Sequence, residues 1–336
     1  MIILIVPKQD EGTYYHRLLV PFKHIPNVRT IEILDLEVAE ETVGSVSDIT
    51  QIWFKGNIAN DFNNVGVFKV ARKAGVKIVM DMDDYWIPPA TARNYMQLWE
   101  ANIPQMLVSQ MRMADHITCT HSLLADSIHK IGIPFKKITI LPNQIDPTEE
   151  QFDREWDYQH EKILWQGSVS HKYDLKQAKE AVQGKDFTIA GFLHTPQWEE
   201  IYDLMKPRKV IYSAPVSEYM AAYHRMGICI TPLLNNKFNR HKSNIKILEG
   251  GYAKKPVLAS KVHPYTSIKN VRFAEDWKQD LQYMLDNPSY CEDLRLALHE
   301  EVCTNHLANN KTRLDLIDYL NDNTNSPIAT TFRKGV

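Results

Sequence analysis

The sequence of 336 residues contains no apolar run long enough to cross a membrane, and few cysteines. It begins MIILIVPKQDEG, where an apolar run of about six residues is shorter than a signal-peptide core or a membrane span. The four cysteines show no CxxC spacing, and Cys119 and Cys229 fall in strand-like runs, where a buried thiol is ordinary. We therefore expect no transmembrane segment and a reducing, cytoplasmic location.

A strong excess of charge of either sign is also missing. The formal net charge is −2, with 18 acidic and 14 basic side chains in residues 1–150 and a slight basic excess in the remainder. A mildly acidic first half disfavours strong nonspecific binding to DNA or to anionic membranes. DNA therefore stays an alternative partner that the charge does not favour.

Apolar strand-like runs alternate with amphipathic helical stretches, and the sequence has no short repeat and no low-complexity segment. Strands are predicted at 2–7, 28–34, 49–54, 76–82, 116–121 and 137–143, with helices at 57–74, 92–113 and 121–131. After the polar stretch 143–161, strands are predicted again at 162–168, 186–192, 209–215, 227–233 and 256–260. Helix-sized spacers between strands indicate parallel pairing through right-handed crossovers.

The restart of the alternation predicts an α/β protein with two tandem Rossmann-like, doubly wound domains and a cleft between them. We place these domains at residues 1–150 and 151–310, followed by a C-terminal helix and tail at 311–336. Asp174, Thr195 and Ser217 precede helical patterns and are predicted to be N-caps. The Met-rich helix predicted at 92–113 is expected to pack on the sheet, although a ligand groove or a membrane surface are alternatives.

The stretch FNRHKSNIKILEGG, residues 238–251, places basic residues at the start of a predicted helix with Ser243 as its N-cap. The helix dipole is already positive at this end, and the basic residues there are Arg240, His241, Lys242 and Lys246. A bound phosphate would remove the conflict, because helix N-termini bind anions and extra cations then help. Alternatively, the side chains extend into solvent, at a cost of about 0.3–1 kcal/mol each.

Three segments carry a resemblance to a known family. Residues 232–260, PLLNNKFNRHKSNIKILEGGYAKKPVLAS, resemble the nucleotide-sugar segment of retaining GT-B glycosyltransferases of the family-4 type. Residues 114–146 are similar to the end of that superfamily's N-terminal domain, and ILWQGSVSHKYDL, residues 163–175, to the opening of its C-terminal domain. The resemblance covers most of residues 1–265. It implies a GT-B fold with an acceptor-side domain first and a nucleotide-sugar-binding domain second.

The resemblance also implies roles for donor-binding residues. Glu249 would accept hydrogen bonds from the ribose hydroxyls, although an ordinary surface glutamate paired with Lys246 is the alternative. Lys242 and Lys246, with Arg240 as a third candidate, would neutralise the diphosphate, and Gly12 would let the backbone approach the phosphates closely. The further donor-binding candidates are Gly12, Arg17, Gly167, Ser168, Arg240, Lys242, Ser243 and Lys246. The sequence departs from the family at His241, which stands where a first glutamate is common.

Asp83 and Asp84 in DMDDYW, together with His171, are the catalytic candidates. For the two aspartates we rank an acceptor or catalytic position first, helix capping or solvation second and a metal-binding D-x-D third, since that motif belongs to GT-A enzymes. His171 is either a donor contact or a loop histidine bonded to its own turn. We expect no metal and no cofactor, and a nucleoside-diphosphate sugar as donor, with a UDP-sugar favoured.

The sequence supports three functional hypotheses. The first is a retaining glycosyltransferase of the EC 2.4 type, acting on a saccharide or another small hydroxyl acceptor. Front-face departure of the nucleoside diphosphate would require no carboxylate nucleophile. The second is a phage-type enzyme that glycosylates hydroxymethylated DNA bases. The third is a catalytically silent nucleotide-sugar-binding protein, for which His241 is the only support.

Overall fold

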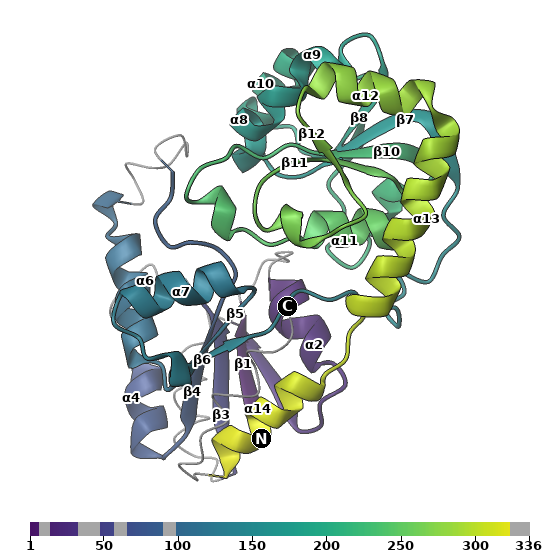
Figure 1. Ribbon diagram of the computed structural model, residues 1–336. Helices are drawn as coiled ribbons and strands as arrows, with labels where there is room; N and C mark the ends of the chain where they lie inside the picture. Colours follow the sequence, from purple (N-terminus) through teal and green to yellow (C-terminus); the bar gives the residue numbers. More distant parts are fainter. Residues whose placement is uncertain (7–13, 33–47, 57–65, 90–98, 323–336) are drawn as a thin grey trace. The chain divides into compact units, whose positions relative to one another are not determined.

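The computed structural model describes residues 1–6, 14–32, 48–56, 66–89 and 99–322 (Figure 1). The chain divides into two compact units, which are described separately. Unit 1 comprises the described residues before 144 together with those from 309 onward, and unit 2 comprises residues 144–308. The chain therefore leaves unit 1, builds unit 2 and returns to unit 1.

Unit 1 is built on six parallel strands, and all six were predicted from the alternation of the sequence. In spatial order they are β2 (Val28–Glu32), β1 (Ile2–Val6), β3 (Gln51–Lys55), β4 (Lys77–Met82), β5 (His116–Cys119) and β6 (Ile138–Ile140). Most of their described side chains are buried, as expected for parallel strands covered on both faces.

Helices cover both faces of this sheet. They are α2 (Val20–Phe22), α4 (Gly66–Lys73), α6 (Ile103–Met113), α7 (Ser122–Lys130) and α14 (Lys311–Asn321), with a π-helix at Tyr15–Leu19 and a short 3-10 helix at Phe135–Lys137. Figure 1 shows α4, α6 and α7 on one side of the sheet and α2 with α14 on the other. Met106 and Met111 of α6 are buried, so the packing role expected for this Met-rich helix is confirmed over residues 103–113.

The last described helix, α14, belongs to unit 1 although it follows unit 2 in the chain. Leu316, Ile317 and Leu320 pack in the same apolar cluster as Trp53 of β3. Gln51 Nε2 donates to the carbonyl oxygen of Ile317 at 2.7 Å, and its Oε1 accepts from Trp53 Nε1 at 2.7 Å. These contacts anchor the end of the chain to the central sheet of unit 1.

Unit 2 contains a second sheet of six parallel strands. In spatial order they are β12 (Arg272–Ala274), β11 (Val257–Ser260), β10 (Met226–Thr231), β7 (Tyr158–Gln166), β8 (Asp186–Phe192) and β9 (Lys209–Tyr212). Five of these strands were predicted, whereas β12, three residues long, was missed. The prediction of two doubly wound sheets is confirmed.

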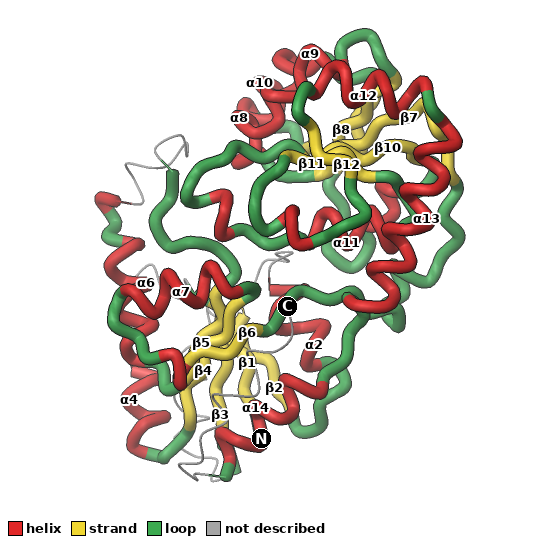
Figure 2. The backbone as a smooth tube through the Cα atoms, in the orientation of Figure 1, coloured by secondary structure: helices red, strands yellow, loops and turns green. Residues whose placement is uncertain are grey.

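The helices of unit 2 form two layers on its sheet. They are α8 (Lys172–Leu175), α9 (Lys179–Val182), α10 (Pro196–Met205), α11 (Ile245–Tyr252), α12 (Trp277–Asp286) and α13 (Pro288–Asn305). Because successive strand residues point to opposite faces, Ile228 and Ile230 of β10 pack in the cluster with α9, α10 and α12, while Cys229 packs in the cluster with α11 and α13. Figure 2 shows this separation of the helices.

The three predicted helix starts had different outcomes. Thr195 is the N-cap of α10, with Pro196 in the first turn, so this prediction is confirmed. Asp174 lies inside α8 rather than before a helix, so its prediction as an N-cap is wrong. Ser217 precedes only a 3-10 helix, Tyr219–Tyr223, so the α-helix predicted there is also wrong.

We expect Gly251→Ala to destabilise unit 2 by about 1–3 kcal/mol. A Cβ at this position of α11 would lie 2.8 Å from Leu298 Cγ and 2.8 Å from Val302 Cγ2 of α13. This overpacking outweighs the roughly 1 kcal/mol of helix propensity that alanine gains over glycine. Urea denaturation measures the free energy of unfolding. The control is a double-mutant cycle with Leu298→Ala, in which Gly251→Ala should cost less; an equal cost in both backgrounds contradicts the packing explanation.

Candidate functional site

The strand order of unit 2 contains a topological switch point between β7 and β10. These strands are neighbours, but the chain leaves β7 toward β8 and leaves β10 toward β11, on opposite sides. In open parallel sheets, ligands bind outside the carboxyl ends of the strands at such a point. The loops that follow β7 and β10 contain residues 167–171 and 232–244, which include most of the donor-binding residues predicted from the sequence.

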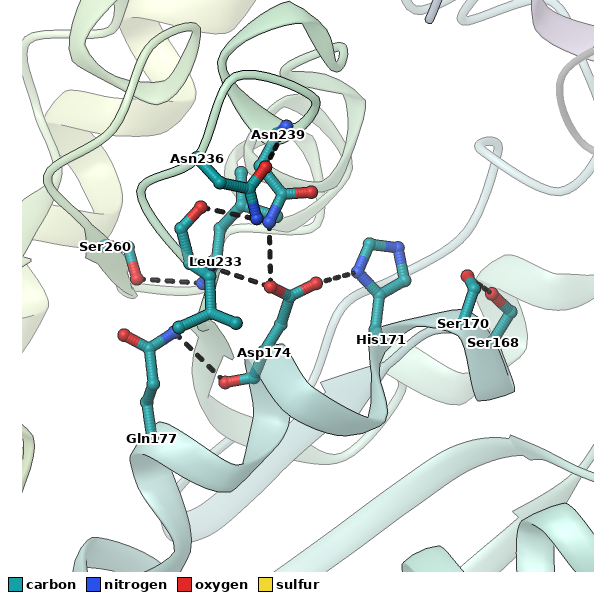
Figure 3. Close-up of polar contacts among 10 residues, drawn as sticks. Ser168, Ser170, His171, Asp174, Gln177, Leu233, Asn236, Asn239 and Ser260 are labelled. Carbon is teal, nitrogen blue, oxygen red and sulfur yellow. Dashed lines mark hydrogen bonds and ion pairs between the residues drawn. The ribbon is translucent and has the colours of Figure 1, made fainter. Parts of the chain in front are cut away.

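The buried carboxylate of Asp174 joins these two loops (Figure 3). Its Oδ1 accepts hydrogen bonds from the backbone N–H of Leu234 at 2.8 Å and from Asn239 Nδ2 at 2.9 Å. Its Oδ2 accepts from His171 Nδ1 at 2.8 Å. Burial opposes ionisation, but these donors and the nearby charge of Lys242 outweigh it and lower the pKa of Asp174. The ionised carboxylate therefore fixes both loops.

His171 lies on the loop after β7 with one ring nitrogen committed to Asp174. Burial and the charges of Lys246 and Lys242 lower the pKa of His171 to about 4, although the bond to Asp174 opposes the shift. The imidazole is therefore neutral at pH 7. Its other nitrogen, Nε2, has no hydrogen-bond partner within the described part of the chain. The histidine is bonded within its own turn, as one of the two predicted alternatives stated, yet it keeps one ring nitrogen available to a ligand.

Lys246, in the first turn of α11, places a second basic group beside the same loop. Its Nζ lies 5.4 Å from the centroid of the Trp165 ring and makes no hydrogen bond or ion pair with any residue that the structure describes. Burial and the charge of Lys242 lower the pKa of Lys246 to about 8. An anion that binds next to such a partly desolvated cation stabilises its charged form.

Gly167 allows Lys246 to approach the loop after β7. A Cβ at Gly167 would lie 2.9 Å from Lys246 Nζ and 2.5 Å from Cζ2 of Trp165. Only glycine fits here without displacing one of these side chains. Ser168 follows, and its hydroxyl forms a hydrogen bond of 2.7 Å with Ser170 Oγ. Gly167, Ser168 and Lys246 therefore lie around one small region of unit 2.

Glu249, one turn after Lys246, is buried between two tyrosines. Tyr219 Oη donates to its Oε1 at 2.6 Å, and Tyr223 Oη donates to its Oε2 at 3.0 Å. Burial and the negative charge of Glu249 raise the pKa of Tyr223, which keeps this hydroxyl protonated and able to donate. Each carboxylate oxygen can accept more than one hydrogen bond, so capacity for further donors exists. The two tyrosines fix the carboxylate, and the sequence analysis missed both.

The start of α11 differs from its prediction. Asn244, not Ser243, is the N-cap, and no side chain caps the helix, so the prediction for Ser243 as a cap is wrong. A 3-10 turn at Asn239–His241 precedes the helix, and the N-cap falls one residue later than predicted. Arg240 is exposed, and its Nε donates to Asn235 Oδ1 at 2.7 Å. His241 is buried, with Nδ1 2.6 Å from the carbonyl oxygen of Lys237.

In unit 1, Arg17 has a structural role. Its guanidinium binds the carboxylate of Asp81 through Nε at 2.9 Å and Nη2 at 2.7 Å. Nη1 donates to the carbonyl oxygen of Leu141 at 2.6 Å and to Asn143 Oδ1 at 3.1 Å. Arg17 is only 2% exposed. This bonding does not favour the anion contact predicted for Arg17, because its donors already bind Asp81 in β4 and two residues just after β6.

The acidic segment after β4 forms a second pair with a basic residue. Asp83 is buried and lies 2.8 Å from Lys55 Nζ at the end of β3. Burial raises the pKa of Asp83, against the opposing charge of Lys55. Asp84 is half-buried beside it. No local pattern in the sequence marks Lys55, because the pairing of β3 with β4 is what brings it close to Asp83.

Gly12 lies outside the described residues. Among those residues, no group of three or more His, Cys, Asp or Glu side chains has an arrangement suited to a metal ion. None of the helices in the described ranges combines the length and the apolar character needed to cross a bilayer.

Comparisons with known proteins identify the fold. No protein-family model and no curated protein matches the sequence. Among solved structures, Anabaena HepE in complex with UDP and glucose is similar over 96% of this chain and 99% of that chain, with a TM-score of 0.62 and 12% identity. AviGT4, a glycosyltransferase involved in avilamycin A biosynthesis, is similar over 96% and 98%, with a TM-score of 0.55 and 11% identity.

A third similar structure is UDP-GlcNAc 2-epimerase from Neisseria meningitidis bound to UDP-GlcNAc. It covers 95% of this chain and 99% of that chain, with a TM-score of 0.50 and 12% identity. The likeness to these proteins extends over both sheets and concerns the fold alone. With its two six-stranded parallel sheets and flanking helices, the chain has the GT-B fold, as the sequence resemblance implied.

We expect Asp81→Asn to destabilise unit 1 by about 3–5 kcal/mol, because it leaves the buried guanidinium of Arg17 without its counter-charge. Urea denaturation of the full chain measures the effect. The matched control is Glu200→Gln, which breaks the ion pair between Lys172 and Glu200. That pair is largely exposed and should contribute less than about 1 kcal/mol. Equal losses in the two variants contradict a structural role for the buried pair.

With UDP as an anionic probe of the region around Lys246, we expect the binding affinity to fall on the order of tenfold between pH 7 and pH 9. A lowered pKa means that the free Lys246 is charged below about pH 8 and becomes neutral above it, so the favourable charge is lost as the pH rises. Lys246→Arg keeps its charge throughout this range and should show a much smaller decrease. Titration calorimetry at both pH values measures the two affinities. Parallel pH profiles for the two proteins contradict this role of Lys246.

Proposed function

We propose that the protein is a glycosyltransferase that uses a nucleoside-diphosphate sugar as its donor, with unit 2 as the donor-binding unit. The observation that carries the proposal is Lys246, a half-buried ammonium group at the switch point of unit 2 that has no anionic partner bonded to it in the described structure. It lies one turn before the fixed carboxylate of Glu249. An anion would provide Lys246 with a counter-charge, and the carboxylate that the two tyrosines hold would accept from a neighbouring pair of hydroxyl groups. A nucleoside diphosphate contains both kinds of group.

The proposed roles follow from this arrangement. Lys242, Lys246 and the N–H groups at the start of α11 would stabilise the negative charge of the departing diphosphate. Ser168 would supply a backbone N–H group, the absence of a side chain at Gly167 would let the phosphates approach closely, and Glu249 would accept from the ribose. Because these groups would neutralise the charge of the diphosphate, we propose that transfer needs no metal ion. We also propose that it proceeds with retention at the anomeric carbon and without a covalent carboxylate intermediate.

For the donor we propose a UDP-sugar, since HepE was solved in complex with UDP and glucose. For the acceptor we propose a saccharide or another small molecule with a hydroxyl group, bound by unit 1. Lys55 with Asp83 is the candidate acceptor contact there. A hydroxymethylated DNA base and a silent binding function remain the alternatives. The free state of all four cysteines fits the proposed cytoplasmic location.

A second candidate function is epimerisation of a UDP-sugar. It rests on the similarity of the fold to UDP-GlcNAc 2-epimerase from Neisseria meningitidis. The two activities have different products, because an epimerase converts one UDP-sugar into another and releases no sugar to an acceptor. A product analysis therefore separates them without knowledge of the natural acceptor.

The activity experiment incubates the purified chain with a panel of UDP-sugars and hydroxyl acceptors, with and without excess EDTA. We expect release of UDP and transfer or hydrolysis of the sugar, undiminished by EDTA. Loss of activity in EDTA, restored by Mg²⁺ or Mn²⁺, contradicts the metal-free proposal. A new UDP-sugar without UDP release identifies an epimerase, and UDP binding without turnover of any donor identifies a silent binder.

A separate prediction tests the assignment of phosphate and ribose contacts. Lys246→Met should weaken UDP binding by about 1.5–3 kcal/mol, the range for hydrogen bonds to charged groups, and leave uridine binding nearly unchanged. Glu249→Gln should weaken UDP and uridine to a similar extent, because the ribose is present in both ligands. Calorimetry gives the four affinities. If Lys246→Met weakens uridine as much as UDP, the cation does not contact the phosphates.

A further inference from the structure

The network around Asp174 contains more hydrogen bonds than are needed to join two loops. Oδ1 receives two N–H donors, from Leu234 and Asn239, and both donors are fixed by their own surroundings. Asn239 Nδ2 also donates to the carbonyl oxygen of Leu234 at 3.0 Å. The neighbouring backbone N–H of Leu233 donates to Ser260 Oγ at the end of β11. The orientation of the carboxylate is therefore set independently of His171.

This orientation determines which nitrogen of His171 carries the proton. Oδ2 of an ionised carboxylate can only accept, so His171 Nδ1 must donate to it across their 2.8 Å separation. In the neutral imidazole, Nε2 then holds a lone pair and no proton. Figure 3 shows the ring of His171 with one nitrogen directed at Asp174 and the other directed away from it.

The surroundings of His171 are those of an anion site. The charged groups that act on it are Asp174 from α8, Lys246 from α11 and Lys242 from the segment before that helix. The two lysines disfavour a second proton on the imidazole. A lone pair at Nε2 would repel a phosphate oxygen, whereas an N–H at the same position would donate to it.

We propose that Asp174 is a positioning residue that makes donor binding dependent on proton uptake by His171. The inference rests on the proposed function. When the diphosphate binds near Lys242 and Lys246, its charge offsets theirs, and His171 takes one proton from solvent at Nε2. The imidazolium then donates through Nδ1 to Asp174 and through Nε2 to a phosphate oxygen. The step forms one N–H bond at Nε2 and breaks one O–H bond of a hydronium ion, which is left as water; no other bond changes.

The isosteric substitution Asp174→Asn should reverse the direction of the hydrogen bond between this side chain and His171. The fixed N–H donors of Leu234 and Asn239 require an oxygen opposite them, so the amide oxygen of the new side chain must take the place of Oδ1. Its NH₂ group then faces His171 Nδ1 and donates to it. The neutral imidazole must therefore carry its proton on Nε2, and a phosphate can bind without proton uptake.

The test is titration calorimetry with UDP-glucose, whose phosphates carry fixed charges between pH 5.5 and 7.5. Binding is measured in two buffers of different ionisation enthalpy, which gives the number of protons taken up. At pH 5.5, we expect the wild-type chain to take up about one proton, and its affinity should fall by up to roughly tenfold for each pH unit between the free pKa of His171, about 4, and the raised pKa of the complex. Lys246 is fully charged at this pH and contributes no uptake.

Asp174→Asn should bind UDP-glucose with almost no proton uptake and with less than about a twofold change in affinity over the same range. The matched control is Asn239→Ala, which removes a hydrogen bond to the other oxygen of the same carboxylate. It should loosen the loop but retain proton uptake. Nitrogen-15 spectra of the histidine ring, recorded without ligand, should show the proton on Nδ1 in the wild type and on Nε2 in Asp174→Asn.

Binding of UDP-glucose to the wild type without proton uptake overturns the inference and leaves the proposed function intact. Equal uptake in the wild type and Asp174→Asn overturns it as well, as does a proton on Nε2 in the free wild type. If neither UDP nor UDP-glucose binds the wild-type chain, the proposed function fails and the inference fails with it. The ring spectra still report separately whether Asp174 sets the tautomer.

Discussion

The geometry of unit 2 at its switch point depends on the ionised carboxylate of Asp174. Three hydrogen bonds from two different loops end on this one group. A hydrogen bond to a charged group contributes about 1.5–3 kcal/mol, and removal of the shared acceptor would leave buried donors unpaired in both loops. The loop after β10 is fixed in turn to β11 through Ser260. The positions of His171 and of the loop at Leu234 and Asn239 therefore depend on a residue that itself need not contact a ligand.

Buried carboxylates have different surroundings in the two units. Glu249 and Asp174 accept hydrogen bonds from neutral donors and lie among lysines, so their surroundings remain suited to an added anion. In unit 1, Asp81 is paired with Arg17 in a bidentate contact, and the guanidinium has further bonds to Leu141 and Asn143. That arrangement is complete within the protein. The difference explains why we assign the donor to unit 2 and a structural role to Arg17.

Most of the fold could be predicted from the sequence, because buried parallel strands read as apolar runs separated by helix-sized spacers. The exceptions have physical reasons. β12 has only three residues and therefore no periodicity to recognise, and the return of α14 to unit 1 depends on contacts between Gln51 and Ile317, 266 positions apart. Asp174 was interpreted as a helix cap because an aspartate before an apolar pattern is typical of one. Its true partners, Leu234 and Asn239, are brought to it by strand order, which no local pattern encodes. The same holds for the tyrosines that fix Glu249.

The central claim is that unit 2 holds the diphosphate of a nucleotide sugar between the loop after β7 and the start of α11. The most direct measurement is a crystal structure of the full chain with UDP. The account predicts the two phosphates next to Gly167, within hydrogen-bonding distance of Lys246 Nζ and of the backbone N–H of Ser168, with the ribose hydroxyls at Glu249. A nucleotide bound by unit 1 at Lys55 and Asp83, or phosphates that do not touch Lys246, would contradict it.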